Sequence, residues 1–257
     1  MRLTEPRATL AVVGRALDLG ATLLDTADLY GDGLNETLVG RAVSGRRADA
    51  IVATKFGVVR RAGGGLGLRG DPAYVPIACD ASLARLGVEV IDLWYLHERD
   101  PSVPIAETVG AMADMVAAGK VRHIGLSEVS GDELRDAHAA HPVAAVQSEW
   151  SLSRRRIEEM VPVCAELGVP VVPFGSLRTV EGSRLNRSLD DLGRRHGVTR
   201  GQISLAWVHA RAVAWGVRIC PIPGTTRVDH LEQNVAAAAI ALDPQELERL
   251  DDPSGRL

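Results

Sequence analysis

Four ionisable side chains of four different types occur at the ends of short apolar runs in the first hundred residues. Asp25 ends the run "LLD", and Tyr30 follows in the glycine-rich turn "LYGDG". Lys55 lies in "IVATKFG", and His97 lies in "IDLWYLHERDP". A phenol is a weak acid with a reference pKa of about 10, and a nearby ammonium favours its ionised form. A carboxylate can keep that ammonium charged, and an imidazole can orient a carbonyl or share the proton.

Such a quartet makes a general acid suited to an oxygen that gains negative charge as a carbonyl group is reduced. No side chain supplies hydride, so this chemistry would need a nicotinamide cofactor. Taken singly, each residue has a simpler structural interpretation. Asp25 could cap a turn, and Tyr30 could be a packed aromatic of the loop. Lys55 could be a solvated charge, and His97 an imidazole of the core. Their shared placement at the ends of apolar runs favours the catalytic interpretation.

The apolar runs that carry these residues are short and rich in Val, Ile and Leu, as buried parallel strands are. The sequence predicts seven strands, at 21–25, 50–55, 91–97, 121–126, 143–147, 170–173 and 217–222. Helical patterns separate them, at 34–44, 74–86, 105–118, 132–139, 155–167 and 200–210, and an opening helix is expected at 8–19.

Alternating strands and helices predict an α/β fold with parallel strands, of the (β/α)8 barrel type. Seven strands are clear, and the missing eighth would precede the opening helix. No shift in composition marks a linker, so residues 1–257 are predicted to form a single domain. In a parallel barrel the active site lies at the carboxyl ends of the strands. The four ionisable residues are therefore expected to converge there.

The overall composition excludes several other classes of protein. The 257 residues are 46% hydrophobic and 24% charged, with a net charge of -4, which gives no electrostatic case for binding nucleic acid or an anionic membrane. No signal peptide or membrane-spanning run is recognisable. Cys79, Cys164 and Cys220 are too few and too dispersed for a disulfide framework, so a cytoplasmic location is expected. The histidines show no metal-ligand spacing, so no metal is predicted.

A glycine-rich stretch, "GLGLRG" at 65–70, matches the pattern of a dinucleotide-binding loop. It does not directly follow a predicted strand, and Asp71 and Pro72 come next instead of an opening helix. We therefore interpret it as a loop over the mouth of the barrel.

The chain resembles the aldo-keto reductases in six stretches that run in the family's order across nearly the whole sequence. They are "LLDTADLYGDGLNETLVGRAV", "ATKFG", "IDLWYLHERDP", "GKVRHIGLSEVS", "AAVQSEWSLSRR" and "PIPGTTRVDHLEQN". The resemblance implies a (β/α)8 barrel that uses NADPH to reduce small aldehydes or ketones. It also implies that Asp25, Tyr30, Lys55 and His97 form the catalytic tetrad, with Tyr30 as the acid.

The same resemblance implies a set of cofactor-binding residues. It assigns the nicotinamide carboxamide to Ser127 and Gln147, the ring stack to Phe174 in place of the usual tyrosine, the phosphates to Gly224, Thr225, Thr226 and Arg227, and the adenine to Gln233 and Asn234. The guanidinium of Arg227 matches the group that binds the 2′-phosphate, which favours NADPH over NADH. Glycine and threonines before a helix also suit a phosphate on physical grounds, because free N–H groups point at the anion.

The sequence departs from the family in three places, one of which is a short C-terminal tail, "LDDPSGRL". The family's N-terminal hairpin and first barrel strand have no counterpart, and the loop after "VVPFGSL" that would fold over the cofactor is short. An open barrel edge is costly, so a second copy of the chain is a candidate to cover it. These departures keep two alternatives open: a cofactor-independent acid–base enzyme (a lyase, dehydratase or cyclase), and a non-catalytic scaffold on the same barrel.

Overall fold

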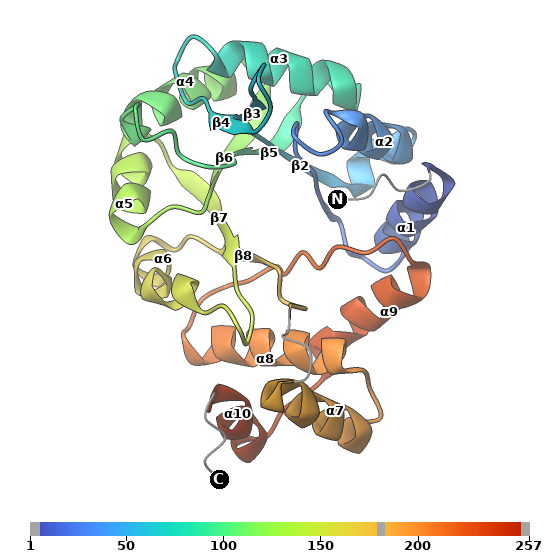
Figure 1. The fold of residues 1–257 in the computed structure, drawn as a ribbon. Coiled ribbons are helices and arrows are strands. Elements are labelled where there is room, and N and C mark those ends of the chain that lie inside the picture. Colours follow the sequence, from blue (N-terminus) through green and yellow to red (C-terminus); the bar gives the residue numbers. More distant parts are fainter. Residues whose placement is uncertain (1–5, 179–182, 253–257) are drawn as a thin grey trace. The chain divides into compact units, whose positions relative to one another are not determined.

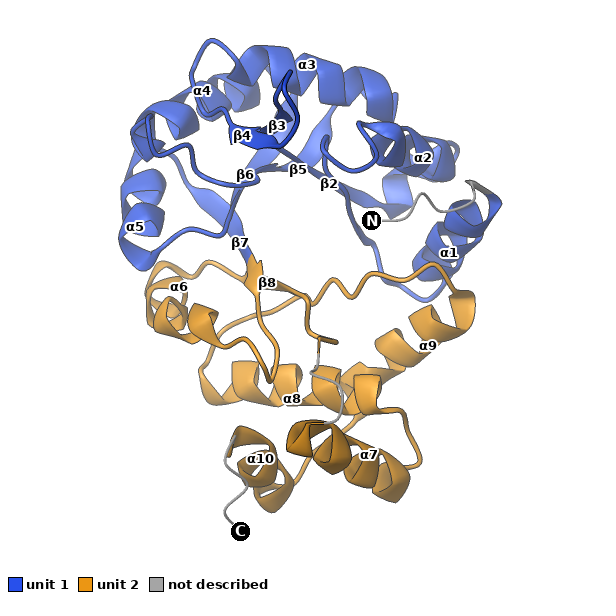
Figure 2. Ribbon diagram, viewed as in Figure 1, with its two compact units in different colours: residues 1–147 blue, residues 148–257 orange. Residues whose placement is uncertain are grey.

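The computed structural model describes residues 6–178 and 183–252 (Figure 1). The chain falls into two compact units, residues 1–147 and 148–257 (Figure 2). No helix in the described part of the chain is both long and apolar enough to span a membrane.

The first unit is built from helices that alternate with parallel strands. Its elements are α1 (Pro6–Asp18), β1 (Leu23–Asp25), α2 (Leu34–Val43), the 3-10 helix η1 (Arg47–Asp49), β2 (Ile51–Phe56), β3 (Val58–Arg60), β4 (Leu66–Leu68), α3 (Val75–Leu86), β5 (Ile91–Leu96), α4 (Ile105–Ala117), β6 (Val121–Ser127), α5 (Gly131–Ala140) and β7 (Val143–Glu149). The strands of its long sheet follow the order β1-β2-β5-β6-β7, and each neighbouring pair among them is parallel. The helices of this unit run along the outer side of the sheet (Figure 1).

The strands are buried because both of their faces are covered, which explains their continuous apolar character. Val52, Trp94, Ile124 and Val146 from four neighbouring strands are all 0% exposed. Every predicted strand of this unit is present, with ends that differ from the prediction by at most two residues.

The second unit is mainly helical. It contains η2 (Arg156–Glu159), α6 (Val161–Leu167), β8 (Val171–Phe174), α7 (Arg184–His196), α8 (Arg200–Ala214), α9 (Val228–Ala236), η3 (Ala237–Ala239) and α10 (Pro244–Asp251). Trp150 and Trp207 are completely buried in it, and their rings pack edge to face with centroids 6.4 Å apart. Both tryptophans therefore belong to the core of this unit.

The prediction of a strand at 217–222 is wrong as stated. Only a parallel bridge between Val171 and Ile219 forms there, although the N–H groups of Cys220 and Ile222 donate to carbonyls of β8 at 3.0 and 2.9 Å. Pro173 of β8 explains the difference, because the next bond of the ladder would need an N–H group at this position to donate to the carbonyl of Cys220, and proline has none.

Two further expectations need correction. The helix predicted at 155–167 is divided into η2 and α6, because Pro162 lacks an N–H group and favours the first turn of a new helix. The stretch 65–70 was interpreted as a loop, but its first residues belong to the antiparallel hairpin of β3 and β4. Gly64 and Gly65 supply the positive φ angles, 86° and 80°, that its turn requires.

We predict that Gly40→Ala destabilises the first unit. Gly40 lies within α2, and an added Cβ would come within 1.9 Å of the carbonyl oxygen of Leu86 at the end of α3. Relief requires the two helices to separate, at a cost of about 1–3 kcal/mol in the free energy of unfolding. Urea unfolding measures this change.

Gly110→Ala is the matched control, because Gly110 also lies inside a helix but has nothing within 4 Å of the added Cβ. It should stabilise the protein by about 0.5–1 kcal/mol. Equal effects of the two substitutions would contradict the packing argument.

Candidate functional site

Three of the four predicted catalytic residues lie at the carboxyl end of three neighbouring strands. Asp25 is the last residue of β1, Lys55 is the fifth of the six residues of β2, and His97 directly follows β5. β1 pairs with β2, and β2 pairs with β5, each in parallel. Tyr30 lies in the turn after β1, whose backbone is tied to β2 because the N–H of Asp28 donates to the carbonyl of Lys55 at 3.0 Å. The strand register therefore brings all four residues to one edge of the sheet.

Lys55 lies at the centre of this group. Its side chain is 2% exposed, and its ammonium donates to Oδ1 of Asp25 and, at 2.8 Å, to the carbonyl oxygen of Thr26. Nζ is also 5.2 Å from the centroid of the Tyr30 ring. A buried ammonium needs such partners, because removing a charge from water without compensation is very costly. The ion pair thus keeps a positive charge beside the phenol ring.

His97 also lies beside the phenol ring. The Tyr30 and His97 ring centroids are 5.8 Å apart, and the rings meet at 85°. Burial, helped by the charge of Lys55, lowers the pKa of His97 to about 4. The imidazole is therefore neutral at pH 7 and acts by hydrogen bonding. Its Nδ1 atom is buried and has no hydrogen-bond partner within residues 6–178 and 183–252.

Gln147 makes a contact that the sequence did not predict. Its side-chain amide donates to Oδ2 of Asp25, the oxygen that Lys55 leaves open. β1 and β7 are separated by three strands in the sheet order, so the sheet must curve strongly for this contact to form. Ser127 is the register partner of Gln147, and both side chains are almost completely buried. One residue that the resemblance assigned to the cofactor, Gln147, therefore contacts the tetrad, and Ser127 lies beside it on the neighbouring strand.

Asp28 and Glu36 are two further acids beside the tetrad that the sequence analysis did not single out. Glu36 is 0% exposed, and it accepts from Thr54 Oγ1 at 2.7 Å and from Arg85 Nε at 2.6 Å. Burial, followed by the charge of Glu36, raises the pKa of Asp28 to about 7. The second acid in "DTADLYG" was the available signal, but the charges that act on it include Arg85, which is distant in sequence.

The remaining predicted cofactor residues belong to the second unit. Phe174 ends β8, and its carbonyl accepts from the Trp150 N–H at 3.1 Å. The others lie at the start of α9 or within it, and they are Gly224, Thr225, Thr226, Arg227, Gln233 and Asn234. The structure therefore places the predicted phosphate and adenine residues around one helix.

Arg227 caps this helix and is well exposed. Its guanidinium forms an ion pair with Asp229, with Nη2 and Oδ2 2.5 Å apart, and its own N–H donates to Thr225 Oγ1 at 3.1 Å. Along the same helix, Nδ2 of Asn234 is buried but bonds to none of the described residues. An unpaired buried donor is costly, so a ligand group that accepts from it would stabilise this side chain.

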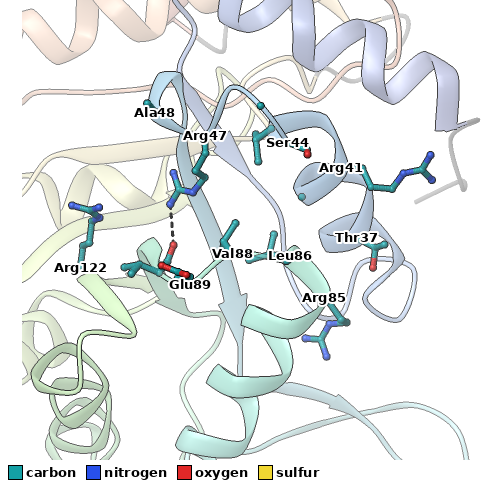
Figure 3. Close-up of a pocket in the computed structure, with 15 residues that line it drawn as sticks. Thr37, Arg41, Ser44, Arg47, Ala48, Arg85, Leu86, Val88, Glu89 and Arg122 are labelled. Carbon is teal, nitrogen blue, oxygen red and sulfur yellow. Dashed lines mark hydrogen bonds between the residues drawn. The ribbon is translucent and has the colours of Figure 1, made fainter.

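A separate pocket of about 800 Å³ lies at the other end of the first unit's strands (Figure 3). Its wall includes Arg47, Arg85 and Arg122, and the first and last of these share Asp92 at 2.6 and 3.0 Å. Arg47 also donates to the carbonyl of Val90 at 2.9 Å. The pocket contains no tetrad residue, and these three guanidinium groups already have partners.

The comparisons with known proteins agree on one family. The model described as "Aldo/keto reductase family" matches residues 3–254. The chain is 41% identical over 272 residues to "Probable aldo-keto reductase 1" of Glycine max, with 94% of this chain and 78% of the relative covered.

Solved structures give the same result. An aldo-keto reductase from Klebsiella pneumoniae in complex with NADPH is 28% identical, with a TM-score of 0.82 and 96% of this chain and 84% of that chain covered. The holo form of an aldo-keto reductase from Bacillus halodurans is 30% identical, with a TM-score of 0.81 and coverage of 96% and 87%. The predicted (β/α)8 fold class is thereby confirmed.

We predict that His97 makes folding stability fall as the solution is acidified. Folding lowers the pKa of His97 from the ordinary 6.5 to about 4. Between these pH values His97 is protonated in the unfolded chain but not in the folded chain, so the free energy of unfolding decreases as pH falls. His97→Asn should reduce this loss between pH 7.5 and pH 4.5 in urea unfolding.

The exposed His123 provides the control, since His123→Asn removes an imidazole from the same unit without touching the tetrad. It should keep the wild-type acid sensitivity. If His97→Asn lost as much stability as the wild type over this range, the burial argument for His97 would be wrong.

Proposed function

The chain belongs to the aldo/keto reductase family, and we propose on this premise that it reduces an aldehyde or ketone with NADPH, taking the proton from Tyr30. The observation that carries this proposal is the buried Lys55 ammonium, held by Asp25 and 5.2 Å from the centroid of the Tyr30 ring. The relative from Klebsiella pneumoniae that binds NADPH supports the choice of cofactor.

Each tetrad residue has a separate task in this mechanism. Tyr30 donates its phenolic proton to the carbonyl oxygen as that oxygen gains negative charge. The Lys55 ammonium stabilises the phenolate that remains, and Asp25 holds the ammonium in place and keeps it charged. His97 is neutral, so its imidazole orients the substrate carbonyl by hydrogen bonding and leaves the proton transfer to Tyr30. Bound NADPH supplies the hydride for the carbonyl carbon.

The residues of the second unit fit a dinucleotide. The first turn of α9 has no cap from the side chain of its N-cap residue, and the guanidinium of Arg227 puts a positive charge at the same end, beside Asp229. The buried Nδ2 of Asn234 needs an acceptor, which an adenine nitrogen can provide. Gln233 precedes it on α9.

A second buried donor follows the strand that ends in Phe174. Ser176 is 2% exposed, and its Oγ atom has no hydrogen-bond partner among the residues placed by the structure. Phe174 offers a ring face for stacking against the nicotinamide. Ser127 and Gln147 would hold the carboxamide, and Gln147 would do so while bonded to the tetrad carboxylate.

We also propose that residues 1–257 act as a single barrel domain, as the family match over 3–254 supports. A small carbonyl compound is the partner that the family implies. Self-association and a cytoplasmic location stay predictions from the sequence.

We predict that Tyr30→Phe lowers turnover of a carbonyl panel by roughly 10²–10⁴-fold, because the general acid is lost. NADPH binding, followed by quenching of tryptophan fluorescence, should be retained. Retained binding shows that the variant is folded and isolates the proton transfer.

Turnover close to that of the wild type would refute Tyr30 as the acid. Failure of the wild type to bind NADPH would instead support a cofactor-independent acid–base enzyme on the same barrel.

We predict that Arg227→Ala weakens NADPH binding by about tenfold, the loss expected for one charge-assisted hydrogen bond. NADH binding should change little, because NADH has no 2′-phosphate for the guanidinium to bind. Arg218→Ala is the control, since Arg218 is another exposed arginine of the same unit, bonded to the carbonyl of Gly168. An equal loss for both cofactors would contradict the assignment.

A further inference from the structure

Asp28 is a half-buried acid in the short loop that joins two tetrad residues, Asp25 and Tyr30. Its N–H donates to the carbonyl of Lys55 at 3.0 Å, and the N–H of Thr26 donates to the carbonyl of Ala53 at 2.9 Å. The loop is therefore fixed to β2 next to the tetrad lysine. Asp28 itself has no part in the proton transfer described above.

The side chain of Asp28 lies near two basic groups, Arg85 and Lys55, that are already paired with other acids. Arg85 comes from α3 and is already engaged, because Nε donates to Glu36 at 2.6 Å and Nη2 donates to Ser82 at 3.1 Å. Gly33 leaves room for it, since an added Cβ would come within 2.3 Å of Arg85 Cδ. Oδ1 of Asp28 is buried and has no hydrogen-bond partner in the described part of the chain.

Charged and titratable groups face Asp28 from every element packed around it. Glu36 of α2 raises the pKa of Asp28, whereas Arg85 of α3 and Lys55 of β2 lower it, as does the backbone N–H of Leu29. Tyr74, just before α3, also interacts with Asp28, and its own pKa is raised chiefly by burial and then by the charge of Asp28. Burial is the largest influence on Asp28, and the balance puts its pKa at about 7.

We propose that Asp28 is a positioning residue for the reduction, and that its protonation state sets the strength of the acid at Tyr30 through the charge presented to Lys55. When Asp28 is neutral, the ammonium of Lys55 has one close carboxylate, Asp25, and acts fully on the phenol. When Asp28 is ionised, a second negative charge offsets part of this effect, and the phenol becomes a weaker acid.

This inference rests on the proposed function but can fail separately from it. His97 has a pKa of about 4, so a change in rate near pH 7 cannot come from its titration. Asp28 has a pKa of about 7 and so changes its charge in that range. The pH dependence of carbonyl reduction therefore reports on Asp28.

The test is the pH profile of kcat for carbonyl reduction, measured with saturating NADPH in wild type and Asp28→Asn. As pH rises, we expect the wild-type kcat to fall roughly threefold to tenfold in a step centred near pH 7. This is the effect expected of one extra, partly screened negative charge. Asp28→Asn, which stays neutral, should show no such step. Persistence of the step in Asp28→Asn, or its absence from the wild type, would overturn the proposal.

Two further variants make the test specific. Asp32→Asn removes an exposed acid from the same loop, one that is paired with Arg60, and should keep the wild-type step. Glu36→Gln should move the step to lower pH, because the charge of Glu36 raises the pKa of Asp28. A step that disappears in Asp32→Asn would mean that the loop, and not the charge of Asp28, determines the rate.

Stability gives a readout that does not require turnover. Folding raises the pKa of Asp28 from 3.8 to about 7, so its contribution to stability is present below pH 3.8 and is lost as pH rises through 7. Asp28→Asn should show a smaller loss over this range in urea unfolding. An equal loss in both proteins would contradict the claim that folding raises the pKa of Asp28. A wild type without any reductase activity would overturn the proposed function and this inference together.

Discussion

The ion pair between Lys55 and Asp25 is the interaction on which the site depends. An ammonium with 2% exposure is stable only if nearby groups replace its water, and Asp25 and the carbonyl of Thr26 do so. Both partners come from the end of β1, so the pair fixes the register of β1 against β2 at the catalytic edge. The turn that carries Tyr30 begins directly after this ion pair. The phenol is therefore held beside the buried ammonium of Lys55.

Much of this arrangement follows from local sequence rules. Short apolar runs between helical patterns predict parallel strands, and parallel strands place their carboxyl ends together. Asp25, Lys55 and His97 could therefore be assigned to one edge before any coordinates were known. The prediction of a strand at 217–222 was wrong because Pro173 on β8 cannot donate to the ladder, and the sequence of 217–222 alone does not show which residue will lie opposite it.

Contacts that depend on curvature or on distant partners could not be predicted. Gln147 reaches Asp25 only because the sheet curves enough to bring together two strands that have three others between them, and strand order alone does not give the degree of curvature. Asp28 is unusual only because Glu36 and Arg85 face it, and Arg85 comes from a helix about fifty residues later. The site thus combines a predictable scaffold with electrostatic interactions that only tertiary structure reveals.

The central claim is that Lys55 acts on the reaction through Tyr30. A double-mutant cycle of Lys55→Gln and Tyr30→Phe, with kcat/KM for carbonyl reduction measured in variants shown to be folded, tests it most directly. The account predicts strong non-additivity: once the phenol is absent, replacing the lysine should reduce the rate little further. Losses that simply multiply would contradict it, because they would mean that the ammonium and the phenol act independently.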